Sequence, residues 1–135
     1  MAHIDAITAI ETYLASVWTA TPVIGVLTDT PRPQAPAPFL VVDYPVTNTE
    51  MKTLGAPGNN VWRDEGTFRI RVHQPKAKAQ LAARQSSEIA ALFLGKTIGG
   101  VQCWGSSEGP LDDENDNGLF YVTSVVVPYD FDHFG

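Results

Sequence analysis

The segment TFRIRVHQ, residues 67–74, constrains the fold most strongly, because apolar and polar side chains alternate along it. Successive side chains of an extended strand point to opposite faces, so this alternation predicts a β-strand with two different faces. The apolar face carries Phe68, Ile70 and Val72, and the other face carries Arg69, Arg71 and His73. We expect the apolar face to join a core and the cationic face to meet either solvent or the acidic surface of a neighbouring copy.

Two segments have the three- and four-residue spacing of apolar side chains that predicts an amphipathic helix. The first helix is expected to end before Pro22, and the second occupies residues 76–95 with Gly95 as its C-cap. The inward side chains expected for the first helix are Ile4, Ile7, Ile10, Leu14, Val17 and Trp18, and those of the second are Leu81, Ile89, Leu92 and Phe93.

The remaining apolar segments predict strands at residues 23–28, 39–46, 98–106 and 119–131, besides the strand that begins at Val61. Residues 47–60 predict a long loop, a candidate contact segment because loops of this length are usually functional or disordered. The element order is therefore α-β-β-β-α-β-β. It predicts one α+β domain over residues 1–135, with two helices packed on an antiparallel or mixed sheet.

Composition and charge exclude several classes of protein. The net charge is −6, all nine basic residues lie between Arg32 and Lys96, and the last 39 residues carry seven acids. This balance argues against nucleic-acid binding, which depends on Lys and Arg. A lone cysteine cannot form an intramolecular disulfide. No segment approaches the length of a membrane span, and the segment MAHIDAIT does not resemble a signal peptide, so we expect a soluble, unexported protein without membrane contacts.

The acidic segment DDENDNG, residues 112–118, matches the first half of an EF-hand calcium loop. Asp113, Asn115 and Asn117 would be its first, third and fifth positions, with Gly118 at the sharp turn. The twelfth position, which needs a bidentate carboxylate, is Ser124. Because strands are predicted on both sides, we interpret the segment as a solvated hairpin tip and keep a calcium-binding module as the alternative.

No constellation of residues points to catalysis. The three histidines lie in unrelated segments, and Cys103 lies in an apolar strand, where an inert buried thiol is the ordinary state. Asp64 and Glu65 precede Gly66, where a turn or bulge explains the pair of carboxylates better than acid–base chemistry does. We therefore expect no enzyme activity, no metal site and no cofactor.

The arrangement of these segments resembles the tail terminator (tail completion) proteins of long-tailed bacteriophages and related phage-like particles. The likeness covers nearly the whole chain, from the N-terminal helix through APFLVVDYPV and WRDEGTFRIRVHQP to IAALFLGKTIGGVQCW. Its most telling part is the block that begins with Gly66 and the alternating strand, continues through Pro75 and the helix, and ends at Phe93 and Gly95.

The resemblance implies a virion structural protein that forms a six-membered ring on the last ring of the tail tube. Such a ring ends tube polymerisation and provides the docking surface for the head connector. Its partners would be further copies of itself, the tail tube protein and a head–tail connector or neck protein. It would be located in the tail or neck of the virion and assembled in the cytoplasm of the bacterial host. The alternatives are a head–tail connector or neck protein, or a small calcium- or ligand-binding module.

The interface positions are assigned on physical grounds, because no motif of the family fixes them. Aromatic and arginine side chains are enriched in protein interfaces, and long loops often form contacts. The candidate subunit or tube interface comprises Met51, Lys52, Leu54, Trp62, Arg69, Arg71 and His73. A candidate acidic surface, facing a partner or the lumen, comprises Asp112, Asp113, Glu114 and Asp116.

Overall fold

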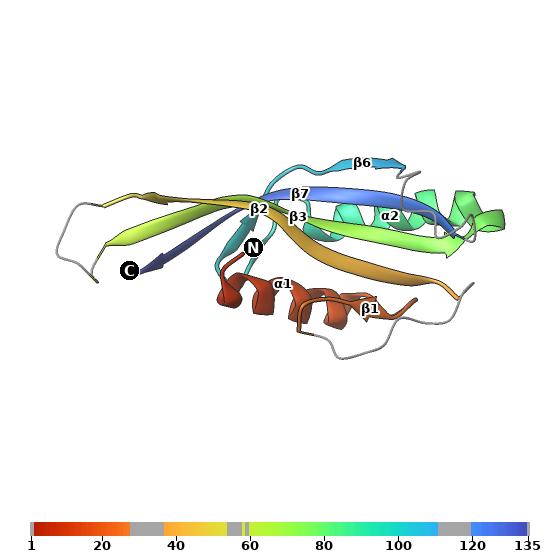
Figure 1. The fold of residues 1–135 in the computed structure, drawn as a ribbon, viewed down its shortest axis with the longest axis horizontal. Coiled ribbons are helices and arrows are strands. Elements are labelled where there is room, and N and C mark those ends of the chain that lie inside the picture. Colours follow the sequence, from red (N-terminus) through yellow and green to blue (C-terminus); the bar gives the residue numbers. More distant parts are fainter. Residues whose placement is uncertain (1, 28–36, 54–57, 59, 111–119, 135) are drawn as a thin grey trace.

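Three long antiparallel strands form the frame of the molecule, seen in a computed structural model that describes residues 2–27, 37–53, 58, 60–110 and 120–134 (Figure 1). The central strand is β3 (Val61–Pro75), which pairs with β2 (Phe39–Met51) on one side and with β7 (Phe120–Phe134) on the other. The expected strand at residues 67–74 is thus the middle of a sheet.

Four short strands complete a seven-stranded mixed sheet in the order β1-β2-β3-β7-β5-β4, with β6 also paired to β7. They are β1 (Val23–Ile24), β4 (Thr97–Ile98), β5 (Val101–Cys103) and β6 (Ser107–Pro110). Among the described strands only β1 pairs in parallel, along β2. The single strand predicted over residues 98–106 is instead a small β4–β5 hairpin, because Gly99 and Gly100 have the positive φ angles, 54° and 88°, of a tight turn.

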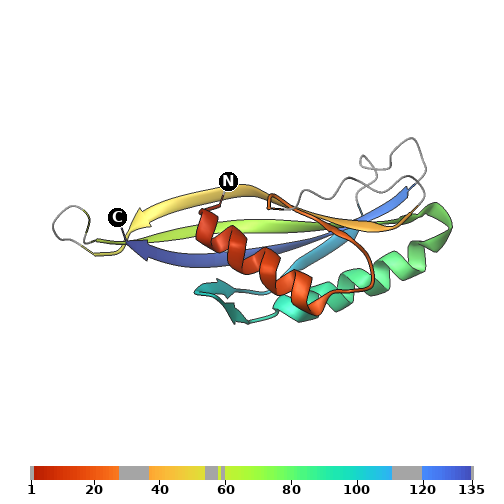
Figure 2. The same ribbon diagram turned by 90° about the horizontal axis from the view of Figure 1, so that it is seen from below.

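Both helices cover the same face of this sheet, so the predicted α+β fold is confirmed (Figure 2). They are α1 (Ile4–Val17) and α2 (Ala79–Phe93), and α2 follows a short 3-10 turn, η1 (Lys76–Lys78). The apolar side of β3 meets them as expected, with Phe68, Ile70 and Val72 fully buried. The prediction was wrong for the two ends of α1, since Ile4 is 55% exposed and Val17 is 40% exposed.

The opposite face of β3 is not the exposed cationic surface that alternation predicted. Arg69 donates two hydrogen bonds to the carboxylate of Asp43 on β2, at 3.2 and 2.9 Å, and Arg71 lies 3.6 Å from the same carboxylate. His73 is only 1% exposed, and its ring stacks on Phe39 with 4.3 Å between centroids. Asp43 faces these arginines because β2 and β3 pair in register, a relation that no local pattern contains.

Strand β2 continues to Met51, so the loop predicted at residues 47–60 begins later than expected. A β-bulge makes this continuation possible: Tyr44 and Pro45 lie between the registered pairs Asp43↔Arg69 and Val46↔Thr67. Pro45 lacks an amide donor and is tolerated at such an irregularity. The bulge is thus on β2, and the turn or bulge predicted at Asp64–Gly66 is wrong, because those residues lie within continuous β3.

Beyond the bulge the three long strands run on together and project past both helices (Figures 1 and 2). We call this part the arm and define it by residues 46–51 of β2, 61–67 of β3 and 128–134 of β7, which pair with one another throughout. The C-terminal end of β7 therefore lies at the tip of the arm.

Candidate interface on the arm

The arm has an open edge and exposed apolar side chains. Among the described residues, no strand pairs with the outer side of β2 between Val46 and Met51. Val46 is 53% exposed, Met51 43% and Phe134 77%. Open strand edges and exposed apolar groups are the features by which sheets recruit further chains. The arm is consequently the best candidate for an interaction surface.

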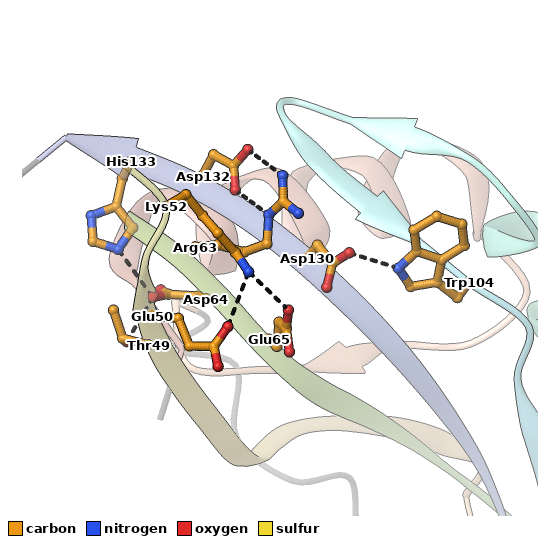
Figure 3. Close-up of polar contacts among 10 residues, drawn as sticks. All are labelled: Thr49, Glu50, Lys52, Arg63, Asp64, Glu65, Trp104, Asp130, Asp132 and His133. Atoms are coloured by element: carbon orange, nitrogen blue, oxygen red, sulfur yellow. Dashed lines mark hydrogen bonds and ion pairs between the residues drawn. The ribbon is translucent and has the colours of Figure 1, made fainter. Parts of the chain in front are cut away.

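The face of the arm turned away from the helices carries paired charges (Figure 3). Arg63 donates two hydrogen bonds to Asp132, at 2.7 and 3.1 Å, and this partner lowers the pKa of the Asp132 carboxyl and raises the pKa of Arg63. Lys52 lies 3.0 Å from Glu50 and 4.0 Å from Glu65. Because these groups are exposed, the pairs contribute little to stability and remain available for exchange with a partner.

The helix side of the arm holds a buried polar cluster. Asp64 is 4% exposed, accepts a 2.7 Å hydrogen bond from the Thr49 hydroxyl, and lies 3.0 Å from Nε2 of His133. The ring of His3, just before α1, lies 4.7 Å from that of His133. The sequence gives no direct sign of this cluster, because its members come from four distant segments. We interpret Asp64 as a structural group that ties β2, β3 and β7 together where α1 begins.

A pocket of about 370 Å³ opens between the arm and the β4–β5 hairpin. Within it Trp104, 50% exposed, donates a 3.1 Å hydrogen bond from its indole Nε1 to Oδ2 of Asp130 (Figure 3). Its lining residues are Arg63, Gly100, Gln102, Trp104, Asp130 and Asp132. Nothing in the sequence indicates that Trp104 would face the carboxylates of Asp130 and Asp132.

The structure separates the predicted interface residues into groups. Met51, Trp62 and Lys52 lie together at the arm, where Met51 pairs with Trp62 across β2 and β3. Arg69 and Arg71 lie on the other side of the bulge beside Asp43, and His73 lies further along β3. The remaining candidates fall outside the described residues; they are Leu54, Asp112, Asp113, Glu114 and Asp116.

The described part of the chain gives no sign of a metal centre, since no three His, Cys, Asp or Glu residues there gather to hold an ion. Neither described helix has both the length and the apolar character needed to span a bilayer.

Cys103 lies in β5 with its side chain fully buried, and burial raises the pKa of its thiol to about 11. The expected result is that folded protein reacts with a thiolate-selective reagent at pH 8 at least about a hundredfold more slowly than urea-unfolded protein. The thiol ionises near its ordinary pKa of 9.0 when unfolded, so its contribution to stability is complete below pH 9 and is lost as the pH rises from 9 to 11. Equal labelling rates in the two states would contradict burial of the thiol.

Comparison with known proteins shows a shared fold but indicates no function. No protein-family model matches the chain, and no curated protein matches it. Several solved structures are similar to the chain, and one of them matches over nearly the full length of both chains, covering 96% of this chain and 95% of the other with a TM-score of 0.61. The two sequences are 23% identical, and the name of the other protein states no function. The chain therefore shares the overall fold of that protein.

Proposed function

We propose that the protein is a structural subunit of a phage or phage-like tail, which assembles into a homohexameric ring capping the tail tube. The ring would end tube polymerisation and offer its outer surface to the head connector or neck protein. The observation that supports this proposal best is the arm, a three-stranded extension with an open β2 edge and exposed Val46, Met51 and Phe134.

The physical argument follows from where the arm lies. It projects past the helices, so much of its apolar surface can be covered only by another molecule (Figure 2). An arm of one copy that contacts a different surface of the next makes a head-to-tail interface, and such interfaces close into rings when the rotation between neighbours permits. The likeness of sequence segments to tail terminators supports the same conclusion. The proposal assigns the chain to the virion, with assembly in the host cytoplasm, and gives it no catalytic residue and no cofactor.

The native mass of the purified protein tests the ring. Six subunits of 14.6 kDa give roughly 88 kDa, and negative-stain images are expected to show closed rings of one diameter. In the matching functional assay, the protein is added to purified tail tube subunits during polymerisation. The tubes are expected to become shorter in proportion to the amount of protein added. The protein should bind at one end of each tube.

Two outcomes would contradict the proposal. If tube length is unchanged and the protein binds no tube end, the capping role is wrong. If the protein instead binds only an isolated head connector, the neck-protein alternative replaces it. A calcium-dependent change in native mass, abolished by a chelator, would favour the binding module with its ligand at residues 112–118.

A further inference from the structure

The pocket beside Trp104 contains one carboxylate that forms no salt bridge within the described part of the chain. Arg63 is engaged by Asp132 through two hydrogen bonds, whereas Asp130 accepts a hydrogen bond from the neutral indole N–H of Trp104. Asp130 forms no ion pair with any described residue. Two carboxylates and one guanidinium leave the pocket with a net negative charge, concentrated on the side where the indole is exposed.

The geometry of this pocket suits a guanidinium group. A planar cation stacks favourably on an exposed indole, and the same group donates hydrogen bonds in the plane to a carboxylate beside the ring. Trp104 and Asp130 present these two partners already joined by a 3.1 Å hydrogen bond, so neither needs to rearrange. Lysine would satisfy the charge but not the planar stacking, which makes arginine the better occupant.

The chain itself carries an arginine that is available for this role. Arg63, Arg69 and Arg71 are engaged with Asp132 and Asp43, but Arg84 lies on the exposed side of α2 and forms no ion pair with any described residue. Lys76 and Lys78 precede it, so residues 75–84 carry three cations and no carboxylate. The arm, with Lys52 directly after its β2 segment, has the opposite balance, with five carboxylates against Lys52 and Arg63.

The arm and the N-terminal end of α2 lie at opposite ends of the elongated molecule (Figure 2). The pocket opens beside the β4–β5 hairpin on the sheet face turned away from the helices, whereas Arg84 lies on α2 toward its far end, so Arg84 can reach the pocket only in another copy. We propose that Arg84 of one copy inserts into the Trp104–Asp130 pocket of the next, which deepens the proposed ring and rests on it. The contact joins two different surfaces and is thus head-to-tail, the type of interface that closes into a ring.

A charge exchange tests this contact directly. Asp130→Arg and Arg84→Asp are each expected to raise the protein concentration needed for half-assembly at least about tenfold, because each places like charges opposite one another. The double variant carrying both changes is expected to return to within about threefold of the natural protein. Native mass across a dilution series gives the readout, and circular dichroism verifies that each variant is folded.

A matched control carries the same change of charge as Arg84→Asp elsewhere. Lys96→Asp, before β4, changes an exposed position outside the pocket and is expected to assemble like the natural protein. Asp130→Asn keeps an acceptor for the indole N–H and removes only the charge, so it tests the contact even if Asp130→Arg does not fold. It is expected to weaken assembly by about tenfold.

The inference and the proposed function fail in different ways. Rings that withstand both single charge reversals, or a folded double variant that stays dissociated, would overturn the Arg84 contact and leave the capping role standing. A natural protein that is monomeric at all concentrations yet shortens tubes would also overturn the contact alone. Failure of the natural protein to shorten tubes would overturn the capping role and leave the contact to the charge exchange.

Discussion

Gly66→Ala is expected to lower the free energy of unfolding by about 3 kcal/mol, corresponding to a fall in Tm of roughly 10 °C. A Cβ atom at this position would lie 2.3 Å from the carbonyl oxygen of Val46 and 3.0 Å from the Cα atom of Thr47. Both are backbone atoms of β2 just beyond the bulge, so no side-chain rotation relieves the clash. The strands would have to separate where the arm begins, and thermal and urea unfolding measure the cost.

Gly109→Ala is the matched control, because Gly109 also lies in a strand and a Cβ atom there would meet nothing within 4 Å. Its unfolding free energy is expected to stay within about 0.5 kcal/mol of the natural protein. Equal effects at the two glycines would show that the loss came from strand propensity and not from the close approach of β2 to β3.

Glu11→Ala is expected to destabilise the protein by about 3 kcal/mol. Glu11 lies on α1, is 7% exposed, and accepts hydrogen bonds from the amides of Val26 and Leu27, both at 3.1 Å, and from the Tyr44 hydroxyl at 2.8 Å. Its removal leaves the hydroxyl buried without this acceptor and releases the segment after β1. Urea unfolding measures the total, and faster hydrogen exchange at the amides of Val26 and Leu27 locates the effect.

Two further variants separate the contributions of Glu11. Tyr44→Phe removes one of the three hydrogen bonds and is expected to cost about 1 kcal/mol. It also removes a phenol whose pKa is raised far above its ordinary value, by burial first and by the Glu11 carboxylate second. Glu88→Ala, at an exposed glutamate of α2, is expected to change stability by less than about 0.5 kcal/mol. If Glu11→Ala lowered the free energy of unfolding no more than Glu88→Ala does, the three hydrogen bonds of Glu11 would make no net contribution to stability.

Periodicity predicted the elements whose geometry is local. Alternation at Phe68, Ile70 and Val72 gave the buried side of β3, and three- and four-residue spacing gave both helices. The expected C-terminal position of Gly95 agrees with its φ of 64° just after α2. These features depend on residues that are close in sequence, so one sequence is sufficient to predict them.

Features that depend on pairing between distant strands were missed. Residues 47–50 are polar and lack strand-like alternation of apolar groups, but they extend β2 because β3 offers a complete row of hydrogen-bond partners. The ion pairs of Asp43 with Arg69 and Arg71 depend on the same register. The Trp104–Asp130 pocket forms only because β5 pairs with β7. Glu11 can accept hydrogen bonds from backbone amides only because the chain after β1 passes beside α1.

The position of β3 in the sheet also determines when the molecule can fold. Strand β7 pairs with β3 along its whole length, from Val61↔Phe134 to Pro75↔Phe120. The two residues of each pair are separated in sequence by most of the C-terminal half of the chain. Loop closure over such distances makes folding slow, and synthesis delivers β7 well after β3. A nascent chain therefore exposes one side of β3 until β7 has also been synthesised. The arm, with its open β2 edge, is complete only after β7 has paired with β3.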